Sequence, residues 1–316
     1  MGKIDLSVVI LSFNTRKLLK RCLGSVVRCL VIGDSEVRKA TSTKPLAPNT
    51  QIIVVDNNSD DESPEMVKKE FPQVKLIRSK KNLGFAGGNN LGLKKASGRY
   101  ILFLNSDTEL FPNTLKKAVD FMETDQKIGA MTPKTMLFSG GMDPDCHRGF
   151  PTPWASFSYF LGLEKLFPKS RIFGQYHKLY QDLNKAHEID AGFGTFMIIR
   201  KDVYKEVGGF DDNYFFYGED LDYFYRIKQA GWKVMFYPKA LLRHHKGGSS
   251  GLRKESKNIT PASRSTRIKT AKASIKAMEI FYKKFYKEKY PGWVTFLVLL
   301  AIKIKSVFRL LKHYLS

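Results

Sequence analysis

The sequence predicts an α/β fold with a mostly parallel sheet flanked by helices. Short apolar runs of strand length alternate with stretches whose apolar residues recur at helical spacing, and this alternation is typical of βαβ units. Polar residues follow several of the runs directly, among them Asn14, Asp56 and Asp107. Because ligands bind beyond the carboxyl ends of the strands in open sheets of this kind, we expect these three side chains at one ligand-binding edge.

Apolar runs predict four strands in the first third of the chain. Residues 6–11 form the first, and a polar turn separates them from residues 16–30, whose apolar side chains predict a helix. The later strands are expected at residues 52–56, 74–78 and 100–104. Residues 31–50 make an unusually long connection, which we expect to be exposed.

The second half of the chain carries fewer signals. We expect a strand at residues 195–199, a short helix at 203–207 that ends at two glycines, and a helix at 221–230 closed by Gly231. Residues 150–185 are rich in aromatic residues and proline, and their pattern predicts no particular element.

The last 66 residues differ in composition from the rest. They hold 16 Lys and Arg against 3 Glu, so +13 of the net charge of +23 falls in about a fifth of the chain. Residues 266–289 predict a Lys-rich helix, and the uncharged run 290–302 is shorter than the roughly 18 residues that span a bilayer. Lys305, Arg309 and Lys312 follow at i, i+4 and i+7. This pattern favours a helix lying in the membrane interface; packing on the protein core or on a homodimer partner is the alternative.

Bulk properties limit the class of protein. A chain of 316 residues, 43% hydrophobic and 26% charged, can bury a full core. Its three cysteines, Cys22, Cys29 and Cys146, are too few for a disulfide framework, so we expect reduced core thiols in the cytosol. The chain opens directly into a predicted strand, so no secretory signal is expected. The basic balance also suggests a nucleic-acid-binding protein, but an apolar run within the basic tail disfavours a nucleic-acid partner.

Two carboxylates at strand ends suggest ligand binding. Asp107 could cap a following helix, or it could bind Mg²⁺ or Mn²⁺ beside a diphosphate, since hard oxygens suit these cations. Asp56 could cap a helix that starts at Ser63-Pro64, or it could bind a nucleoside. Residues 82–90, Asn-Leu-Gly-Phe-Ala-Gly-Gly-Asn-Asn, predict a Gly-rich loop before a helix, and backbone amides there can approach an anion closely.

A second group of candidates lies downstream. Glu219, Asp220 and Asp222 follow an aromatic triplet, and crowded carboxylates beside aromatic rings become basic enough to accept a proton. One of the three can cap the helix, and Asp222 can pair with Arg226 at i, i+4. His244 and His245 are either structural or a further metal ligand, and Lys246 could contact phosphate.

Six ordered motifs over roughly residues 5–250 resemble the inverting family 2 glycosyltransferases. They particularly resemble the rhamnosyltransferase-like branch that builds bacterial surface polysaccharides. In chain order the motifs are Leu6-Ser-Val-Val-Ile-Leu-Ser-Phe-Asn14, Ile53-Val-Val-Asp-Asn-Asn-Ser59, Asn82-Leu-Gly-Phe-Ala-Gly-Gly-Asn-Asn90, Leu104-Asn-Ser-Asp107, Gly208-Gly-Phe-Asp211 and Tyr217-Gly-Glu-Asp-Leu-Asp222.

The resemblance implies a GT-A fold, a nucleoside-diphosphate sugar donor and a divalent cation, Mg²⁺ or Mn²⁺. It implies that Asp220 is the general base beside Glu219, and that Asp107 and His244 hold the metal. The residues implied in donor binding are Ser12, Asn14, Asp56, Asn58, Asn82, Gly84, Asn89, Asn105 and Asp107. Those implied in acceptor binding are Gly192, Tyr217 and Asp222.

The donor is expected to be dTDP-rhamnose, with UDP-hexoses as the alternative. Asn105 stands where the metal motif often begins with Asp, so weak, donor-assisted metal binding is expected. The Gln-x-x-Arg-Trp element of processive relatives is absent, so one sugar per encounter is expected. A basic nucleic-acid-binding or membrane-binding protein without catalysis is the alternative from another class.

The resemblance also suggests a division of the chain. Residues 1–250 are expected to form the catalytic domain, with residues 1–132 binding the nucleotide sugar and residues 133–250 the acceptor. The implied acceptor is a polyprenyl-diphosphate-linked saccharide. Such an acceptor would explain residues 251–316 as a basic tail on an anionic membrane surface, at the inner face of the plasma membrane of a cytoplasmic protein.

Overall fold

One mixed sheet organises the part of the chain that the computed structural model describes, residues 3–37, 48–247 and 264–315. Its strands are β1 (Leu6–Ser12), β2 (Thr50–Asp56), β3 (Lys75–Arg78), β4 (Tyr100–Asn105), β5 (Thr108–Leu110), β6 (Ile128–Leu137), β7 (His187–Glu188), β8 (Phe196–Arg200) and β9 (Lys233–His244). They lie in the order β3-β2-β1-β4-β8-β6-β9-β5, and β7 pairs with β9 off this path.

The predicted α/β class is confirmed, and each predicted strand is present. Strands β3, β2, β1 and β4 are parallel. The other half is mixed, because β8 is antiparallel to both of its neighbours, β5 and β7 are antiparallel to β9, and β6 is parallel to β9. The expectation of a mostly parallel sheet therefore holds for the first half alone.

Strands β6 and β9 were not predicted from the sequence. β9 alternates buried side chains with partly exposed ones, so it lacks the continuous apolar run that indicates a buried strand. It also contains Pro238, and its register with β6 shifts between Pro133 and Lys134. Such an irregularity bends a strand locally, and a proline inside the pattern argues against a central strand.

Two layers of helices cover the sheet. One core cluster joins alternate β1 residues such as Val8 to α1 (Arg16–Val37), α2 (Ser63–Glu70) and α4 (Thr114–Glu123). The other joins Val9 to α3 (Gly84–Leu93), α7 (Lys201–Val207) and α8 (Glu219–Gln229). The side-chain period of two in a strand produces this division. Helix α1 continues to Val37, past the predicted end, and residues 38–47 of the predicted connection lie outside the described residues.

The predicted Gly-rich loop is mostly helix, because α3 begins at Gly84. A Cβ atom at Gly88 would lie 2.4 Å from Leu11 Cδ1, and one at Gly92 would lie 2.3 Å from Val9 Cγ1. The glycines therefore let α3 approach the sheet closely. Gly84 itself has φ of +73°, which glycine adopts at little cost.

The aromatic stretch without a predicted element contains two short helices, α5 (Pro153–Phe160) and α6 (Leu163–Leu166). Thr152 caps α5, since its hydroxyl oxygen accepts a hydrogen bond from Ala155 N at 3.1 Å. The three cysteines are free and buried, as predicted.

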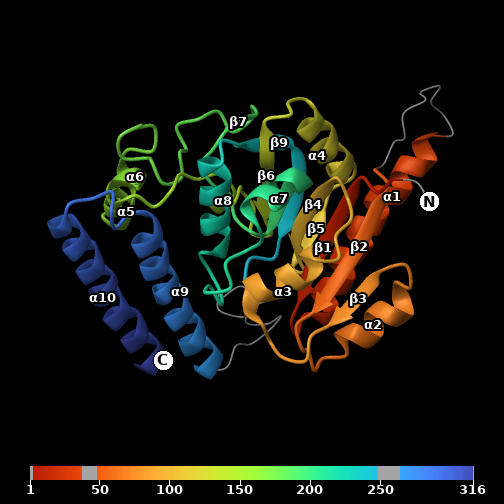
Figure 1. Ribbon diagram of the computed structural model, residues 1–316, viewed down its shortest axis with the longest axis horizontal. Coiled ribbons are helices and arrows are strands. Elements are labelled where there is room, and N and C mark those ends of the chain that lie inside the picture. Colours follow the sequence, from red (N-terminus) through yellow and green to blue (C-terminus); the bar gives the residue numbers. More distant parts are fainter. Residues whose placement is uncertain (1–2, 38–47, 248–263, 316) are drawn as a thin grey trace.

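The C-terminal segment forms α9 (Arg264–Phe285) and α10 (Gly292–Leu315), at the end of the molecule away from α1 (Figure 1). Tyr225 of α8 packs on Phe281 and Phe285, with ring centroids 5.7 and 4.2 Å away. Helix α9 is therefore part of the folded body, although its sequence suggested a basic tail. Among the described helices, none combines the length and apolar character required to cross a bilayer.

Candidate active site

A four-residue loop before β8, residues 192–195, connects the two acid-bearing segments singled out in the sequence. Thr195 O accepts a hydrogen bond from Asn105 N at 3.0 Å, and Gly194 N donates to Asp220 Oδ2 at 3.1 Å. The Phe193 ring lies 5.5 Å from the His244 ring, measured between centroids. The loop thus gathers the end of β4, the start of α8 and the end of β9 at one place.

Asp107 and His244 lie together, almost fully buried. The Nε2 atom of His244 is 3.4 Å from Asp107 Oδ1, because β5 pairs with β9 and places Thr108 opposite His244. Asp107 caps no helix, since residues 108–110 form β5. Burial alone would lower the pKa of His244, but the carboxylates of Asp107 and Asp143 outweigh it and raise the pKa to about 9.

Asp143, which the sequence did not single out, faces the other side of the His244 ring. Its Oδ2 atom is 3.8 Å from Nδ1, and its side chain is fully buried. Lys246 Nζ lies 2.6 Å from Asp143 Oδ1 and 2.5 Å from Asp145 Oδ2. Lys246 is therefore engaged by two carboxylates, and the predicted phosphate contact would have to compete with them.

The Asp107–His244 pair offers one carboxylate and one imidazole to a cation. Within residues 3–37, 48–247 and 264–315, no group of three or more His, Cys, Asp and Glu side chains is arranged to hold a metal. Both available groups are ordinary metal ligands. The donor set therefore fits a cation that completes its coordination with oxygen atoms of a bound ligand, as Mg²⁺ does at phosphates.

Asp220 is held by a buried arginine. Arg148 Nη2 donates to Asp220 Oδ2 at 2.9 Å, and Arg148 Nε donates to Gly192 O at 2.9 Å. Burial alone would lower the pKa of Arg148, but Asp220 and Tyr176 raise it, so the guanidinium stays charged. Sequence reasoning missed Arg148, because it lies in the stretch without predicted elements and belongs to no motif.

Glu219 lies next to this ion pair, at the first turn of α8. Burial and the neighbouring charge of Asp220 raise the pKa of Glu219 well above its ordinary value. Its Oε2 atom accepts no hydrogen bond from the described residues. Tyr217 and Gly218 precede it with φ of +71° and +85°, so the turn into α8 is strained at Tyr217. Strain of this kind clusters at functional sites.

Asp222 occupies a different environment. It is fully buried, and its oxygens lie 2.6 Å from Arg226 Nε and 2.7 Å from Lys284 Nζ. The predicted i, i+4 pair with Arg226 is confirmed. Both oxygens are engaged in connecting α8 internally and to α9. The acceptor contact of Asp222 stays a prediction, and an acceptor hydroxyl would have to compete with these two cations.

The predicted donor-binding residues of the first two strands lie at the carboxyl edge of the parallel sheet. Ser12 pairs with Asp56 in the β1–β2 register. A hydroxyl chain runs from Ser12 through Thr15 to Ser106, with both oxygen–oxygen distances 3.0 Å. Thr15 and Ser106 were not singled out, although they stand beside predicted residues.

The loops after β1 and β2 hold each other in place. Asn14 and Asn58 have φ of +52° and +69°, and Asn14 Oδ1 accepts a hydrogen bond from Asp60 N at 2.9 Å. Asp56 does not cap α2. The N-cap is Glu62 and Ser63 is the first helical residue, which corrects the predicted helix start.

The remaining predicted residues shape the site through local contacts. Asn82 Oδ1 accepts hydrogen bonds from Gly84 N at 2.9 Å and from Asn57 Nδ2 at 3.1 Å. The buried Asn89 donates to Phe85 O at 3.0 Å. A Cβ atom at Gly192 would lie 2.2 Å from Thr132 Cγ2, so glycine is needed there for packing.

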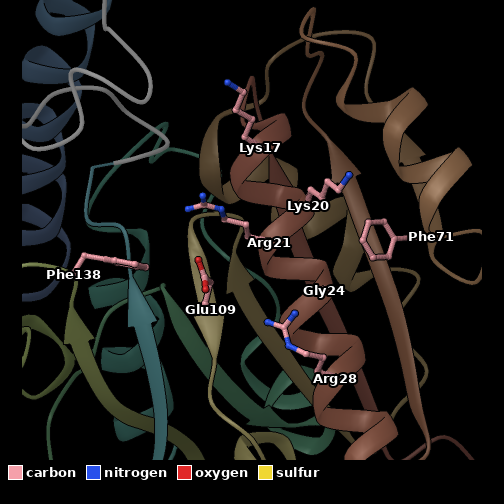
Figure 2. Close-up of a pocket in the computed structure, with 8 residues that line it drawn as sticks. All are labelled: Lys17, Lys20, Arg21, Gly24, Arg28, Phe71, Glu109 and Phe138. Atoms are coloured by element: carbon pink, nitrogen blue, oxygen red, sulfur yellow. The ribbon is translucent and has the colours of Figure 1, made fainter.

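A separate basic pocket of about 730 Å³ runs along α1, on the face of the sheet that α1 covers (Figure 2). Its lining residues are Lys17, Lys20, Arg21, Gly24, Arg28, Phe71, Glu109 and Phe138. Lys20 pairs with Glu70 at 2.7 Å, and Glu109 is 3.1 Å from His245 Nε2. None of the residues predicted for catalysis lines this pocket.

Comparison with known proteins agrees with this geometry. The model "Glycosyl transferase family 2" matches residues 7–208, and "N-terminal domain of galactosyltransferase" matches residues 174–246. The chain is similar to the N-acetylglucosaminyl-diphospho-decaprenol L-rhamnosyltransferase of Mycobacterium tuberculosis, with 24% identity over 213 residues, 63% of this chain and 68% of the relative. It is also similar to the low-salt glycan biosynthesis hexosyltransferase Agl10 of Haloferax volcanii, with 22% identity over 225 residues, 70% and 67% of the two chains.

Two solved structures share the fold. The mannosyltransferase PcManGT from Pyrobaculum calidifontis, in complex with GDP-Man and Mn²⁺, gives a TM-score of 0.57 at 15% identity and covers 99% of this chain and 74% of that one. GalNAc-T7 with UDP, GalNAc and Mn²⁺ gives 0.56 at 20% identity, covering 90% and 50%. The fold is therefore GT-A. Since the family model matches well over half of the residues, the chain belongs to glycosyl transferase family 2.

Proposed function

We propose that this glycosyltransferase moves one sugar, with inversion, from a nucleoside-diphosphate donor to a polyprenyl-diphosphate-linked saccharide. The observation that carries the proposal is the loop 192–195, which brings the Asp107–His244 pair and the Arg148–Asp220 pair to one place. The Asp107–His244 pair suits a cation bound to a diphosphate, and Asp220 of the other pair suits a general base. The relative from M. tuberculosis, named as a rhamnosyltransferase that acts on a decaprenol diphosphate, supports L-rhamnose and such an acceptor; a UDP-hexose is the alternative donor.

In the proposed reaction Asp220 takes the proton of an acceptor hydroxyl. Arg148 and Gly194 N–H keep Oδ2 oriented during this step, since both donate to it. The hydroxyl oxygen attacks the anomeric carbon from the face opposite the diphosphate. The bond from that carbon to the diphosphate oxygen breaks, and its electron pair leaves with the nucleotide. One displacement inverts the configuration.

The donor would lie across the carboxyl edge of the parallel strands. Ser12, Asn14, Asp56 and Asn58 suit the nucleoside, because they are polar groups on the two loops that end β1 and β2. Asn105 ends β4 and Asp107 follows it two residues later, and both suit the diphosphate. A Mg²⁺ or Mn²⁺ ion held by Asp107 and His244 would offset the negative charge on the departing nucleotide.

We assign the proposed roles to consecutive parts of the chain. Residues 1–132 would bind the donor, residues 133–250 the acceptor, and the basic segment 251–316 would keep the enzyme at the inner face of the plasma membrane. A lipid-linked acceptor gives the reason, since the reacting hydroxyl is then confined near the bilayer. A homodimer built on the same segment is the alternative.

A panel of nucleoside-diphosphate sugars with Mg²⁺ or Mn²⁺ tests the proposal. We expect one donor to be hydrolysed slowly, with nucleoside diphosphate released, and we expect release to stop in Asp107→Ala. Asp202→Ala is the matched control, because its side chain is exposed on α7. If no donor is cleaved and no donor raises the melting temperature, the proposal is wrong.

A further inference from the structure

One face of α10 is apolar and exposed to solvent. Eight large apolar side chains on the described part of this helix are 40–70% exposed: Trp293, Phe296, Leu297, Leu300, Ile304, Val307, Phe308 and Leu311. Their spacing of three and four residues places them on one side. Val298 and Leu299 lie on the other side and pack against the aromatic cluster of α8 and α9. The helix is therefore anchored to the protein by one face and presents a second apolar face outward.

The cations predicted to form a stripe on this helix do not occupy the exposed face. Lys305 and Arg309 are half-buried, and Lys305 Nζ lies 3.7 Å from the centroid of the Phe160 ring in α5. Burial, with a smaller effect from the charge of Arg309, lowers the pKa of Lys305 to about 8. The side chain of Lys312 lies outside the described residues. Lys305 therefore connects α10 to the aromatic segment around α5 and α6.

That segment, residues 153–172, is a second exposed apolar surface. Its exposed large side chains are Trp154, Phe157, Tyr159, Phe160, Leu161, Leu166, Phe167 and Ile172. Figure 1 shows α5, α6 and α10 at the same end of the molecule, away from α1. Exposed apolar patches of this extent mark a binding surface for a protein or a membrane.

Charge distinguishes between these two occupants. The exposed charges of residues 153–172 are cations, namely Lys165, Lys169 and Arg171. The single acid there, Glu164, is buried and bonded to His177 at 3.1 Å. On α10, Lys303 is exposed, and residues 292–311 contain no acid. A second copy of the same surface would bring like charges together, whereas anionic lipid headgroups complement them.

We propose that residues 153–172 and the exposed face of α10 form one membrane-docking surface for an anionic bilayer. The inference extends the proposed function and rests on it in one respect, since only a lipid-linked acceptor gives the enzyme a reason to dock. Aromatic and aliphatic side chains would enter the headgroup boundary, and the flanking lysines and arginines would meet the phosphates.

The surface is connected directly to the candidate active site. Arg148, which holds Asp220, precedes α5 by only a short segment. From α6, a polar chain runs from Glu164 through His177 to Asp145, 3.1 and 3.7 Å apart. Lys246 then joins Asp145 to Asp143 beside His244. Docking would therefore place the acceptor half of the enzyme against the bilayer.

Flotation with vesicles of phosphatidylglycerol and phosphatidylcholine in equal amounts tests the proposal. One variant, Phe157→Glu with Leu161→Glu, alters the first patch, and another, Phe296→Glu with Phe308→Glu, alters α10. Each changes the charge by −2, and so does the control Lys69→Glu on the exposed side of α2. We expect the natural protein and the control to float, and each double variant to lose about tenfold or more in partitioning. Pure phosphatidylcholine should bind less of every protein.

Two results would overturn the proposal. If the Phe157–Leu161 variant floats like the natural protein, residues 153–172 are not part of a membrane surface. If the natural protein does not float but is a dimer by light scattering, and the variants are monomers, the surface binds a second copy. Circular dichroism of each variant, together with a second variant of the first patch, Phe157→Ser with Leu161→Ser, excludes loss of folding as the cause of lost flotation. Donor hydrolysis needs no membrane, so its retention in all variants separates this proposal from the proposed function.

Discussion

Replacing Arg148 by methionine would test the central ion pair of the site. Arg148 and Asp220 have side chains only 9% and 13% exposed, and removing one partner of a buried pair costs about 3–5 kcal/mol. Gly194 N and Leu221 N still donate to Asp220 in the variant, so its charge keeps two hydrogen-bond donors. We therefore expect a cost at the lower end of this range, about 3 kcal/mol. The lost hydrogen bond to Gly192 O adds about 1 kcal/mol.

The expected loss of about 4 kcal/mol corresponds to a melting temperature lower by about 8 °C, at about 2 °C per kcal/mol for a chain of this size. Differential scanning calorimetry measures it. Arg78→Met is the control, because its pair with Glu65 at 3.2 Å is half exposed and should be worth less than about 1 kcal/mol.

A double-mutant cycle with Asp220→Asn makes the reasoning refutable. The double variant removes both charges, so it should be about 3 kcal/mol more stable than the sum of the single effects predicts. Additivity within about 0.5 kcal/mol would show that Arg148 and Asp220 do not interact.

Three other predictions concern the site and the packing beneath it. Asp220→Asn should lower transfer by about 10²-fold or more, while donor-induced thermal stabilisation persists; retained turnover would remove its role as base. Glu219 has a raised pKa in the folded state, so its contribution to stability is present in full below about pH 4 and is lost as pH rises through the raised pKa. The melting temperature of Glu219→Gln should therefore rise relative to that of the natural protein as pH increases. A difference in melting temperature that does not change with pH would contradict the raised pKa of Glu219. Gly92→Ala should cost about 1–3 kcal/mol in denaturant unfolding, since its Cβ would meet Val9 Cγ1 at 2.3 Å. Gly24→Ala, with Arg28 as its one neighbour at 3.5 Å, should be neutral or stabilising.

Part of the site was predictable because it follows from local pattern. Apolar runs locate β1, β2 and β4, and parallel strands bring their carboxyl ends to one edge whatever lies elsewhere in the chain. Asp56 and Asp107 are placed at that edge by this rule alone. The roles assigned to these residues, and to Glu219 and Asp220, remain predictions.

Other features had no local signal. A Gly-rich segment is typical of a loop, and only the neighbouring Val9 and Leu11 side chains show why glycine is required in a helix that lies close to the sheet. Likewise α9 has the composition of a solvated tail, yet Lys284 reaches Asp222, 62 residues earlier, and the aromatic rings beside it are buried.

The sequence by itself determined the α/β class, the family and the acids at the strand ends, because these depend on residues that are close in the chain. Only the tertiary structure decided which groups surround those acids. Arg148 contacts Asp220 across 72 residues of sequence. Asp143, in the connection between β6 and β7, contacts His244 at the end of β9. Contacts at such separations depend on how the sheet is ordered, and burial then makes them strong, since a charge removed from water must find its partner within the protein.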